Sequence, residues 1–331
     1  MFPAISRRRW RRWLGLVVLT GWVTSGLARG ATGLEVVRHD DRFSVRFDGE
    51  LLTEWRVKGA PKPYFYPLLG PGGVPVTRHF PMRTDVEDED RDHPHQRSLW
   101  FTHGDVNGVD FWAEGPTRGR IVFQDLLDLT TGAEGGQIRT SNKWMTAEGK
   151  VLLSDVTRFR VERSPLGRQF EISITLHASE GEEVTFGDTK EGTMGIRLAE
   201  SMRLKPNRHY AGKPHGRILQ STGVKDGATW GKRAAWTAYS GPVGGTTITV
   251  SIFDHPSNPR HPTWWHVRDY GLFAANPFGV HDFERKPAGT GNLVLKAGEK
   301  ATFRYRFLVQ DGEPDPRRLN EVATQFAASP H

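Results

Sequence analysis

The sequence contains no cysteine, so the protein has no disulfide bond, no thiolate nucleophile and no thiolate metal ligand. Its 331 residues must therefore be held together by a hydrophobic core. Long apolar runs are also lacking, because no segment after residue 30 is apolar enough to span a bilayer. These absences exclude disulfide-stapled scaffolds and cysteine-dependent enzymes. They predict no membrane partner for the chain once its leader is removed.

Acidic residues are missing from the first thirty positions, which hold six arginines. Five of these arginines precede an apolar run from Trp13 to about Val23, and Ala28-Arg29-Gly30 supplies the small residues of a cleavage site. We expect a signal peptide of residues 1–30, cleavage before Ala31 and an exported, periplasmic or secreted protein. The short apolar run favours removal over an uncleaved anchor, while the choice between Sec and twin-arginine export stays open.

The charge of the remaining chain is close to neutral. Subtracting the six leader arginines from 45 basic residues leaves 39 against 38 acidic residues, so the formal charge falls from +7 to +1. A protein that binds nucleic acid through a basic face carries a clear excess of Lys and Arg. We therefore expect no nucleic-acid partner.

The body of the chain has the pattern of an all-β protein. Alternating apolar and polar residues, bounded by Gly, Asp or Ser-Pro, predict consecutive antiparallel strands. Near the C-terminus, Pro316 and an apolar stripe predict a short packed helix over residues 315–327. One domain of residues 31–331 is the simplest interpretation. The predicted strands lie within residues 34–57, 120–124, 136–146, 150–162, 169–179, 236–239, 246–253, 293–295 and 301–309.

Histidine, acidic and aromatic side chains are concentrated in the segment 92–112, which reads D-H-P-H-Q-R-S-L-W-F-T-H-G-D-V-N-G-V-D-F-W. Convergent imidazoles and carboxylates with aromatic walls suit a polyhydroxylated ligand, a metal ion or both. For each residue alone, a hydrogen bond to the backbone is the simpler interpretation, but the cluster as a whole favours a site. Its candidate site residues are His93, His95, Arg97, His103, Asp105, Asp110 and Trp112.

The local geometry of this segment follows partly from Pro94, which disfavours a helical conformation at His93 and favours an extended chain. In an extended chain His93 and His95 share a face, and so do His103 and Asp105 unless Gly104 bends the chain. The acidic tract just before it, residues 85–92, is predicted to be a solvated loop.

A second segment with the same character spans residues 254–279 and reads D-H-P-S-N-P-R-H-P-T-W-W-H-V-R-D-Y-G-L-F-A-A-N-P-F-G. Its candidate site residues are His255, His261, Trp265, His266 and Arg268. We expect both segments to converge on one cleft, with His103 and His266 together in it. The candidates are completed by Glu191, in a polar, glycine-containing turn predicted over residues 189–197, and by the pair Lys62 and Tyr64.

Both segments resemble those of an exported bacterial family labelled methane oxygenase PmoA, and the resemblance extends over nearly all of residues 31–331. It implies an antiparallel β-supersandwich similar to galactose mutarotase. That fold binds sugars in a cleft lined by His, Arg, Asp, Glu and Trp, and in mutarotases a histidine acid and a glutamate base open and reclose the sugar hemiacetal.

The residue chemistry favours a carbohydrate-active protein of the isomerase, lyase or hydrolase type, with a neutral or weakly acidic saccharide as ligand. In this hypothesis His103 or His266 is the general acid and Glu191 or Asp105 is the base. Arg97 and Arg268 hold substrate oxygens, and Trp112 or Trp265 stacks on the sugar ring. The mutation His103→Ala is then expected to remove activity and leave the fold intact.

Two alternatives stay open. A non-catalytic sugar-binding module needs aromatic and hydrogen-bonding side chains but no acid and base with separated pKa values. A metal-dependent oxidase, as the family label implies, would use a divalent metal held by His93, His95 and His103 with Asp105 or Asp110. The spacing of His93 and His95 is only weakly diagnostic of such a site.

Overall fold

Two eight-stranded antiparallel sheets make up most of the described chain, which comprises Met1 and residues 33–330 of a computed structural model. Residues 33–330 form one compact unit. The expected antiparallel all-β class is confirmed. The predicted signal peptide lies outside the described residues apart from Met1, so its removal stays a prediction.

Sheet 1 is built from the N-terminal strands and from three strands that come later in the chain. Its order is β1 (Leu34–Arg38), β2 (Arg42–Phe47), β3 (Glu50–Arg56), β4 (Tyr64–Leu68), β5 (Leu99–His103), β11 (Gly192–Arg197), β16 (Leu272–Asn276) and β15 (Trp264–Val267). The predicted meander over residues 34–57 is confirmed as β1 to β3.

Sheet 2 contains most of the longer strands. Its order is β12 (Arg217–Gln220), β13 (Trp236–Val243), β14 (Thr246–Asp254), β18 (Lys300–Asp311), β9 (Arg168–Ala178), β8 (Val151–Glu162), β7 (Gly135–Met145) and β6 (Arg120–Thr130). Strand β6 is longer than the predicted 120–124, because irregularities after Phe123 and after Leu126 break the alternation that predicts a strand. A separate pair, β10 (Val184–Phe186) and β17 (Leu293–Leu295), extends to one side.

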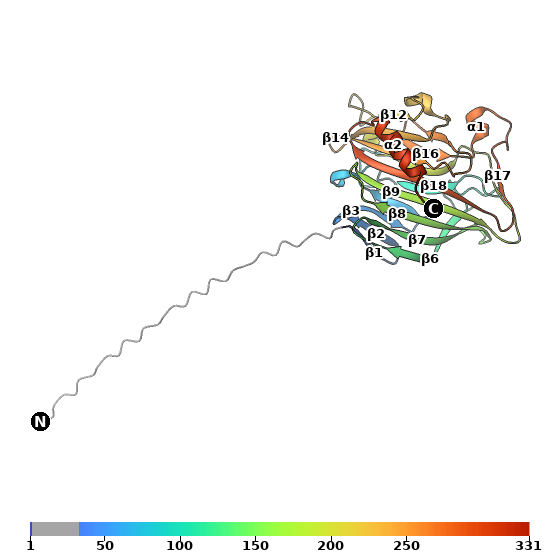
Figure 1. The fold of residues 1–331 in the computed structure, drawn as a ribbon, viewed down its shortest axis with the longest axis horizontal. Coiled ribbons are helices and arrows are strands. Elements are labelled where there is room, and N and C mark those ends of the chain that lie inside the picture. The colour runs from blue at the N-terminus through green and yellow to red at the C-terminus, as the bar shows by residue number, and fades with distance from the viewer. Residues whose placement is uncertain (2–32, 331) are drawn as a thin grey trace. The chain divides into compact units, whose positions relative to one another are not determined.

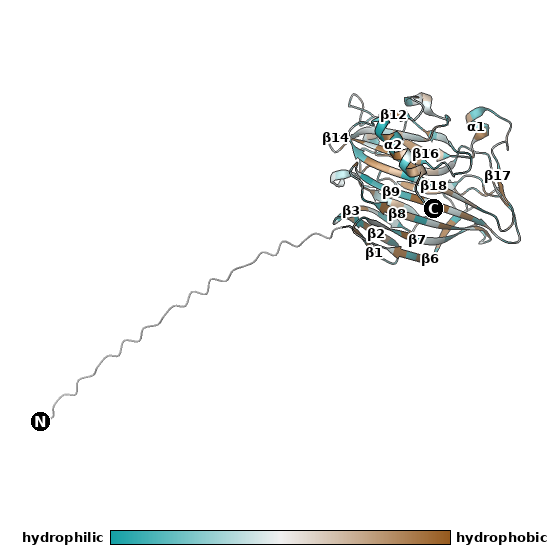
Figure 2. Cartoon of the chain, in the orientation of Figure 1, coloured by the Kyte–Doolittle hydropathy of each residue, from teal (hydrophilic) through white to brown (hydrophobic). Residues whose placement is uncertain are grey.

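The main core lies between the two sheets. Every second residue of a strand points inward, and brown and teal alternate along parts of β8 and β9 in Figure 2. Trp55 and Phe65 of sheet 1, for example, pack against Phe159 of sheet 2 with ring centroids 6.2 and 4.8 Å away. Burial of such large apolar side chains is the main source of stability in a chain without disulfides.

Two helices and three short 3-10 turns complete the described chain. The predicted C-terminal helix is confirmed as α2 (Pro316–Ala327), with the Asp315 carboxylate accepting a hydrogen bond from the backbone N–H of Arg317 at 3.0 Å. Its apolar stripe packs on the outside of sheet 2 against Trp236, Phe253 and Leu308 (Figure 1). The other elements are α1 (Val280–Glu284), η1 (Pro71–Gly73), η2 (Glu200–Met202) and η3 (Asp226–Thr229).

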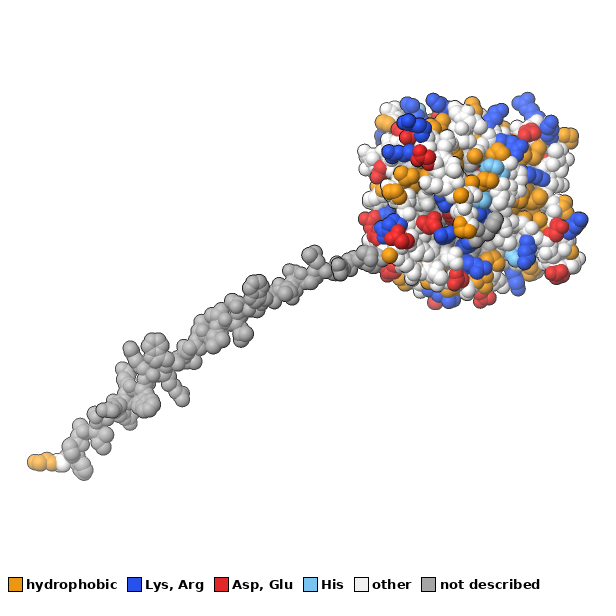
Figure 3. All heavy atoms as spheres, in the orientation of Figure 1, with side chains coloured by type: hydrophobic (Ala, Val, Ile, Leu, Met, Phe, Trp, Pro, Cys, Tyr) orange, Lys and Arg blue, Asp and Glu red, His pale blue; other side chains and the backbone are white. Residues whose placement is uncertain are grey.

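The surface of the folded part mixes both signs of charge. Figure 3 shows Lys and Arg side chains interspersed with Asp and Glu over the face displayed. Among the residues that the structure describes, no helix has the length and apolarity to cross a bilayer.

Strand β11 corrects one expectation from the sequence. Residues 192–197 were expected in a polar turn, because two glycines interrupt the pattern, but they form a fully buried strand in the middle of sheet 1. A Cβ on Gly192 would lie 2.6 Å from Nδ1 of His103, and one on Gly195 would lie 2.9 Å from the Trp100 ring. The glycines therefore make room for large neighbours on β5 instead of forming a turn.

Candidate functional site

The face of sheet 1 that points away from sheet 2, here called the outer face, carries a second cluster of aromatic side chains. Tyr64, Trp100 and Ala274 belong to this cluster. Backbone pairing places them in one row across the sheet, from Tyr64 through Trp100, Gly195 and Ala274 to His266. The row brings β15, from the second histidine-rich segment, onto the same face as β5, from the first.

His93 lies over this face in contact with a carboxylate. Its Nδ1 is 2.9 Å from Oδ2 of Asp92, and its ring stacks on Tyr270 at 5.3 Å with an interplanar angle of 6°. The contact favours the tautomer with the proton on Nδ1 and leaves Nε2 free to accept a proton. The His93 side chain is 41% exposed, so Nε2 is accessible to a ligand.

The backbone at His93 differs from the expected extended chain. Its φ angle is 44°, in the left-handed region, and its carbonyl accepts hydrogen bonds from Gln96 N at 3.0 Å and from Arg78 Nη2 at 3.1 Å. These bonds, together with the contact to Asp92, select a tight turn over the extended conformation that Pro94 favours locally. The turn still brings the rings of His93 and His95 close together, at 5.7 Å.

Asp92 is held in place by two buried arginines. Its Oδ1 accepts hydrogen bonds from Arg78 and, at 3.0 Å, from Nη2 of Arg197. Burial by itself would raise the pKa of Asp92, but the hydrogen bond from His93 and the charges of Arg197 and Arg78 lower it well below its usual range. The carboxylate is therefore ionised at neutral pH, and it orients His93.

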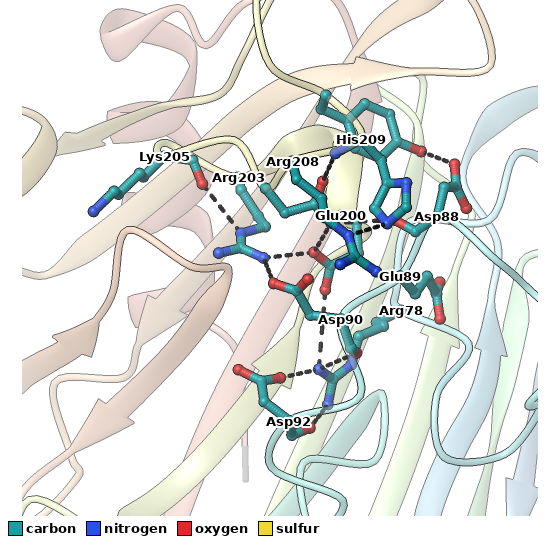
Figure 4. A network of polar contacts seen from close by, with 12 residues as sticks. Arg78, Asp88, Glu89, Asp90, Asp92, Glu200, Arg203, Lys205, Arg208 and His209 are labelled. Atoms are coloured by element: carbon teal, nitrogen blue, oxygen red, sulfur yellow. Dashed lines mark hydrogen bonds and ion pairs between the residues drawn. The ribbon is translucent and has the colours of Figure 1, made fainter.

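The acidic tract that the sequence placed in a solvated loop is instead part of this network (Figure 4). Buried Glu200 accepts a hydrogen bond from Arg203 at 2.7 Å, and its other oxygen lies 3.5 Å from Arg197. Asp90 binds Arg203, and the Glu89 carboxylate accepts from the backbone N–H groups of residues 79 and 80. The prediction of simple solvation is wrong, because distant arginines supply partners that a local pattern does not reveal.

Glu191 lies immediately before β11 and is partly exposed, at 39%. Burial raises the pKa of its carboxyl, Lys190 opposes this increase, and the charges of Asp282 and Asp110 add to it. His93 is also close enough for its charge to act on Glu191. A carboxyl with a raised pKa retains its proton to higher pH than an ordinary glutamate.

His266, Trp230 and Arg268 border the same region. The buried His266 has Nδ1 2.8 Å from the carbonyl of Lys190, and its ring lies 6.3 Å from that of Trp230. The guanidinium of Arg268 lies over two rings, 6.0 Å from the centroid of Trp230 and 5.6 Å from that of Tyr270. We define the outer-face site as Asp92, His93, Glu191, Trp230, Arg268 and Tyr270.

Several other predicted residues lie beside this site but are bound to protein partners. The Glu114 carboxylate accepts hydrogen bonds from Lys62 at 2.9 Å and from Arg97 at 2.8 Å. Asp110 accepts from the backbone N–H of Trp112 at 2.8 Å and pairs with Arg118 at 3.0 Å. The rings of His95 and Trp112 lie 6.2 Å apart, and Tyr64 packs in the aromatic cluster beneath.

His103 lies on the opposite face of sheet 1, so the expectation that it shares a cleft with His266 is wrong. Its side chain is fully buried between Phe186 and Phe278, and its Nε2 donates to the carbonyl of Gly187 at 2.7 Å. The reason is the alternation of a strand, which places His103 and Trp100 on opposite faces of β5. We do not include His103 in the site proposed below.

Four further candidates also lie away from the outer-face site. The Asp105 carboxylate accepts from Gly108 N at 2.8 Å within a turn, and Trp265 is buried in the main core. His255 packs against Phe326 of α2, and Nδ1 of His261 lies 2.8 Å from Asp254. The second segment therefore divides, and only its part from His266 onward reaches the outer face.

The five candidate ligands for a divalent metal are not brought together. His93 and His95 are neighbours on the outer face, whereas His103 lies in the core and Asp105 in its own turn. Within Met1 and residues 33–330, no group of three or more His, Asp or Glu side chains is placed to hold a metal ion.

A family model matches residues 42–324, which is most of the chain. The chain belongs to DUF6807, a family of unknown function. None of the curated proteins matches it. The resemblance to a family labelled methane oxygenase PmoA is not supported by these comparisons.

Solved structures similar to this DUF6807 chain include galactose mutarotase-like proteins. One from Lactobacillus casei has 8% identity and a TM-score of 0.34 and covers 84% of this chain and 100% of its own. A putative aldose 1-epimerase from Escherichia coli has 12% identity and a TM-score of 0.32 over 84% and 99% of the two chains. A glycoside hydrolase family 97 enzyme from Pseudoalteromonas, in complex with panose, has 12% identity and a TM-score of 0.33 over 85% and 34%. These TM-scores are too low to support an inference about activity.

Three residues of the outer-face site in this DUF6807 chain were not singled out from the sequence. Asp92 directly precedes His93, so an Asp-His pair could have been considered. Tyr270 lies two residues after Arg268 in the second segment. Trp230 lies outside both segments, and no local pattern marks it.

Because His103 and His266 are buried, we expect acid to destabilise this DUF6807 protein. Burial lowers the pKa of both His103 and His266 to about 4, whereas a histidine in the unfolded chain titrates near about 6.5. Between these values the unfolded chain binds protons that the folded chain does not. The stabilisation is therefore complete above about pH 6.5 and is lost as the pH falls toward 4, by about 1.4 kcal/mol per pH unit for each histidine.

Urea unfolding of the wild type and of His266→Gln at pH 7 and pH 5 measures this effect. Both proteins share the same carboxylates, so the difference between their pH slopes isolates His266. The variant is expected to lose clearly less stability than the wild type on acidification. Equal losses in the two proteins would show that His266 is not held neutral in the folded state.

Proposed function

We propose that the outer-face site of this protein binds a saccharide and transfers protons to and from it. The observation that carries the proposal is the 2.9 Å contact between Asp92 and Nδ1 of a partly exposed histidine, His93. A carboxylate in this position fixes the histidine tautomer and stabilises the imidazolium that forms when Nε2 takes up a proton. His93 therefore acts as the general base.

Glu191 acts as the general acid in this proposal. Burial raises the pKa of its carboxyl, so a larger fraction is protonated near neutral pH than for an ordinary glutamate. Asp92 is ionised and contacts His93, whereas burial raises the pKa of the Glu191 carboxyl, so the two groups of the proposed pair lie in different electrostatic environments.

The surrounding rings support a sugar as the ligand. Trp230 and Tyr270 are both partly exposed, and the Arg268 guanidinium lies over both rings. Sites for small polar molecules combine such apolar surfaces with a few placed hydrogen-bonding groups. The partly exposed Trp230 ring can pack on the C–H face of a pyranose, while His93, Glu191 and Arg268 contact its oxygens.

The simplest reaction for one base and one acid is the opening and reclosing of a cyclic hemiacetal. His93 removes the proton of the anomeric hydroxyl, the bond between the anomeric carbon and the ring oxygen breaks, and the ring oxygen takes a proton from Glu191. Reclosure on the other face of the carbonyl returns both protons and inverts the anomeric centre. The reaction consumes no other reactant.

A panel of free sugars tests this proposal. D-galactose, D-glucose, D-galacturonate and D-glucuronate would each be titrated into the mature protein, and the exchange between their anomers would be followed by NMR. Saturable binding with accelerated exchange of at least one sugar is expected. Binding without acceleration would identify a non-catalytic binding module, and no binding by any of the four would contradict the proposal.

A further inference from the structure

Arg268 differs in its contacts from the other cations that lie near the outer-face site. It lies in the turn that joins β15 to β16, where its backbone N–H donates to the carbonyl of Leu272 at 2.7 Å. Its guanidinium lies over the rings of both Trp230 and Tyr270. The backbone bond and the two rings therefore hold this partly exposed cation in one place.

The Arg268 guanidinium has no acidic partner and no side-chain hydrogen bond within residues 33–330. The nearby arginines are all engaged. Arg97 makes three hydrogen bonds to Glu114, at 2.8–3.1 Å, and Arg197 binds both Gln96, at 2.7 Å, and Asp92. Lys190 pairs with Asp282 at 3.6 Å and with Glu191 at 3.7 Å.

A fixed guanidinium with free donors is suited to a planar anion. Its N–H groups form a rigid fork that matches the two oxygens of a carboxylate, and such charge-assisted, bidentate hydrogen bonds are among the strongest in proteins. The rings on which it stacks hold it in position, so less side-chain entropy is lost on binding.

We propose that Arg268 binds the carboxylate of the saccharide, which makes a uronic acid, and not a neutral sugar, the preferred ligand of the outer-face site. This inference rests on the proposed function, because it assigns the substrate class of the same site. From the sequence, Arg97 and Arg268 were equivalent candidates for contacts to substrate oxygens. The structure separates them, since only Arg268 keeps its donors free.

The charges nearby favour a singly charged group over a phosphate or sulfate ester of higher charge density. Asp92 is ionised beside His93, and Glu191 and Asp282 are carboxyl groups close to the same region. The Arg268 cation balances one negative charge, and a second negative charge on the ligand would be repelled by these carboxylates.

Matched sugar pairs test the inference. Binding of D-galacturonate against D-galactose, and of D-glucuronate against D-glucose, would be measured by calorimetry for the wild type, Arg268→Gln, Arg268→Lys and Arg139→Gln. Arg139 is a suitable control, because it is exposed on β7 in sheet 2 and also lacks an acidic partner.

The wild type and Arg139→Gln are expected to prefer each uronate over its neutral partner by about tenfold to a hundredfold. Arg268→Gln should abolish the preference, because it lowers the affinity for each uronate far more than the affinity for its neutral partner. Arg268→Lys should restore part of the preference, because it keeps the charge but loses the bidentate geometry.

Binding of the four sugars distinguishes a wrong role for Arg268 from a wrong proposed function. Equal binding of uronates and neutral sugars, unchanged in Arg268→Gln, would overturn the assignment of Arg268 and leave the saccharide site standing. Absence of binding by all four sugars would overturn both. A uronate preference that Arg139→Gln also abolishes would mean that general surface charge, and not Arg268, recognises the carboxylate.

Discussion

Replacing His93 with glutamine is expected to reduce the rate of anomer exchange by about 10²–10⁴-fold, which is the usual contribution of a positioned general base. Glutamine keeps a polar side chain that can reach Asp92, but it cannot accept and release a proton at neutral pH. Because the His93 side chain is 41% exposed and glutamine can keep the contact to Asp92, the thermal midpoint of unfolding should change little.

The measurement is a comparison of exchange rate, sugar affinity and thermal midpoint for the wild type, His93→Gln and His215→Gln. His215 is an exposed histidine away from the outer-face site and controls for loss of an imidazole as such. The sugar affinity should change far less than the rate, because proton transfer matters most in the transition state. An unchanged rate in His93→Gln would remove the histidine from the mechanism.

The largest stability effect is expected for Glu200→Gln. Glu200 is 2% exposed, accepts hydrogen bonds from Arg203 at 2.7 Å and Asn207 at 3.0 Å, and lies 3.5 Å from Arg197 and 3.9 Å from Arg78. Burial raises its pKa, and the charges of Arg203, Arg197 and Arg78 oppose that increase. Removing one partner from such a buried group leaves the other charges uncompensated, at a cost of about 3–5 kcal/mol.

Urea unfolding at pH 7 measures this loss, with Glu182→Gln as the control. Glu182 also pairs with a cation, Lys150, at 3.0 Å, but both side chains are more than half exposed, so its loss should have little effect. Since Arg197 and Arg78 also hold Asp92, Glu200→Gln should slow anomer exchange as well. A stability close to that of Glu182→Gln would show that the buried carboxylate does not hold the arginines together.

Much of the fold could be predicted because its strands are regular. Residues 136–146, 150–162 and 169–179 each contain a stretch of alternating apolar or β-branched residues, and they form β7, β8 and β9 almost as expected. The less regular strands were harder to predict. The pairing of β6 is irregular at two points, and the glycines of β11 predict a turn until their large neighbours on β5 are known.

The candidate site could be predicted only in part. The sequence marked two segments, and the structure brings His93 of the first against Tyr270 of the second. The sequence alone could not show which residues of each segment lie on which face of sheet 1. His103 and Trp265 point into the core, whereas Trp100 and His266 lie on the outer face, because successive residues along a strand point to opposite faces.

The sequence by itself determined the antiparallel β class, the C-terminal helix and the two segments in which reactive side chains are concentrated. These features depend on local patterns of hydrophobic residues, caps and turns. Only the tertiary structure decided which charged groups are free. Arg197 meets Asp92 across 105 positions of sequence and Arg97 meets Glu114 across 17, while Arg268 meets no acid. Ion pairs depend on distances of a few ångströms between side chains, and the folding of distant strands against one another sets those distances.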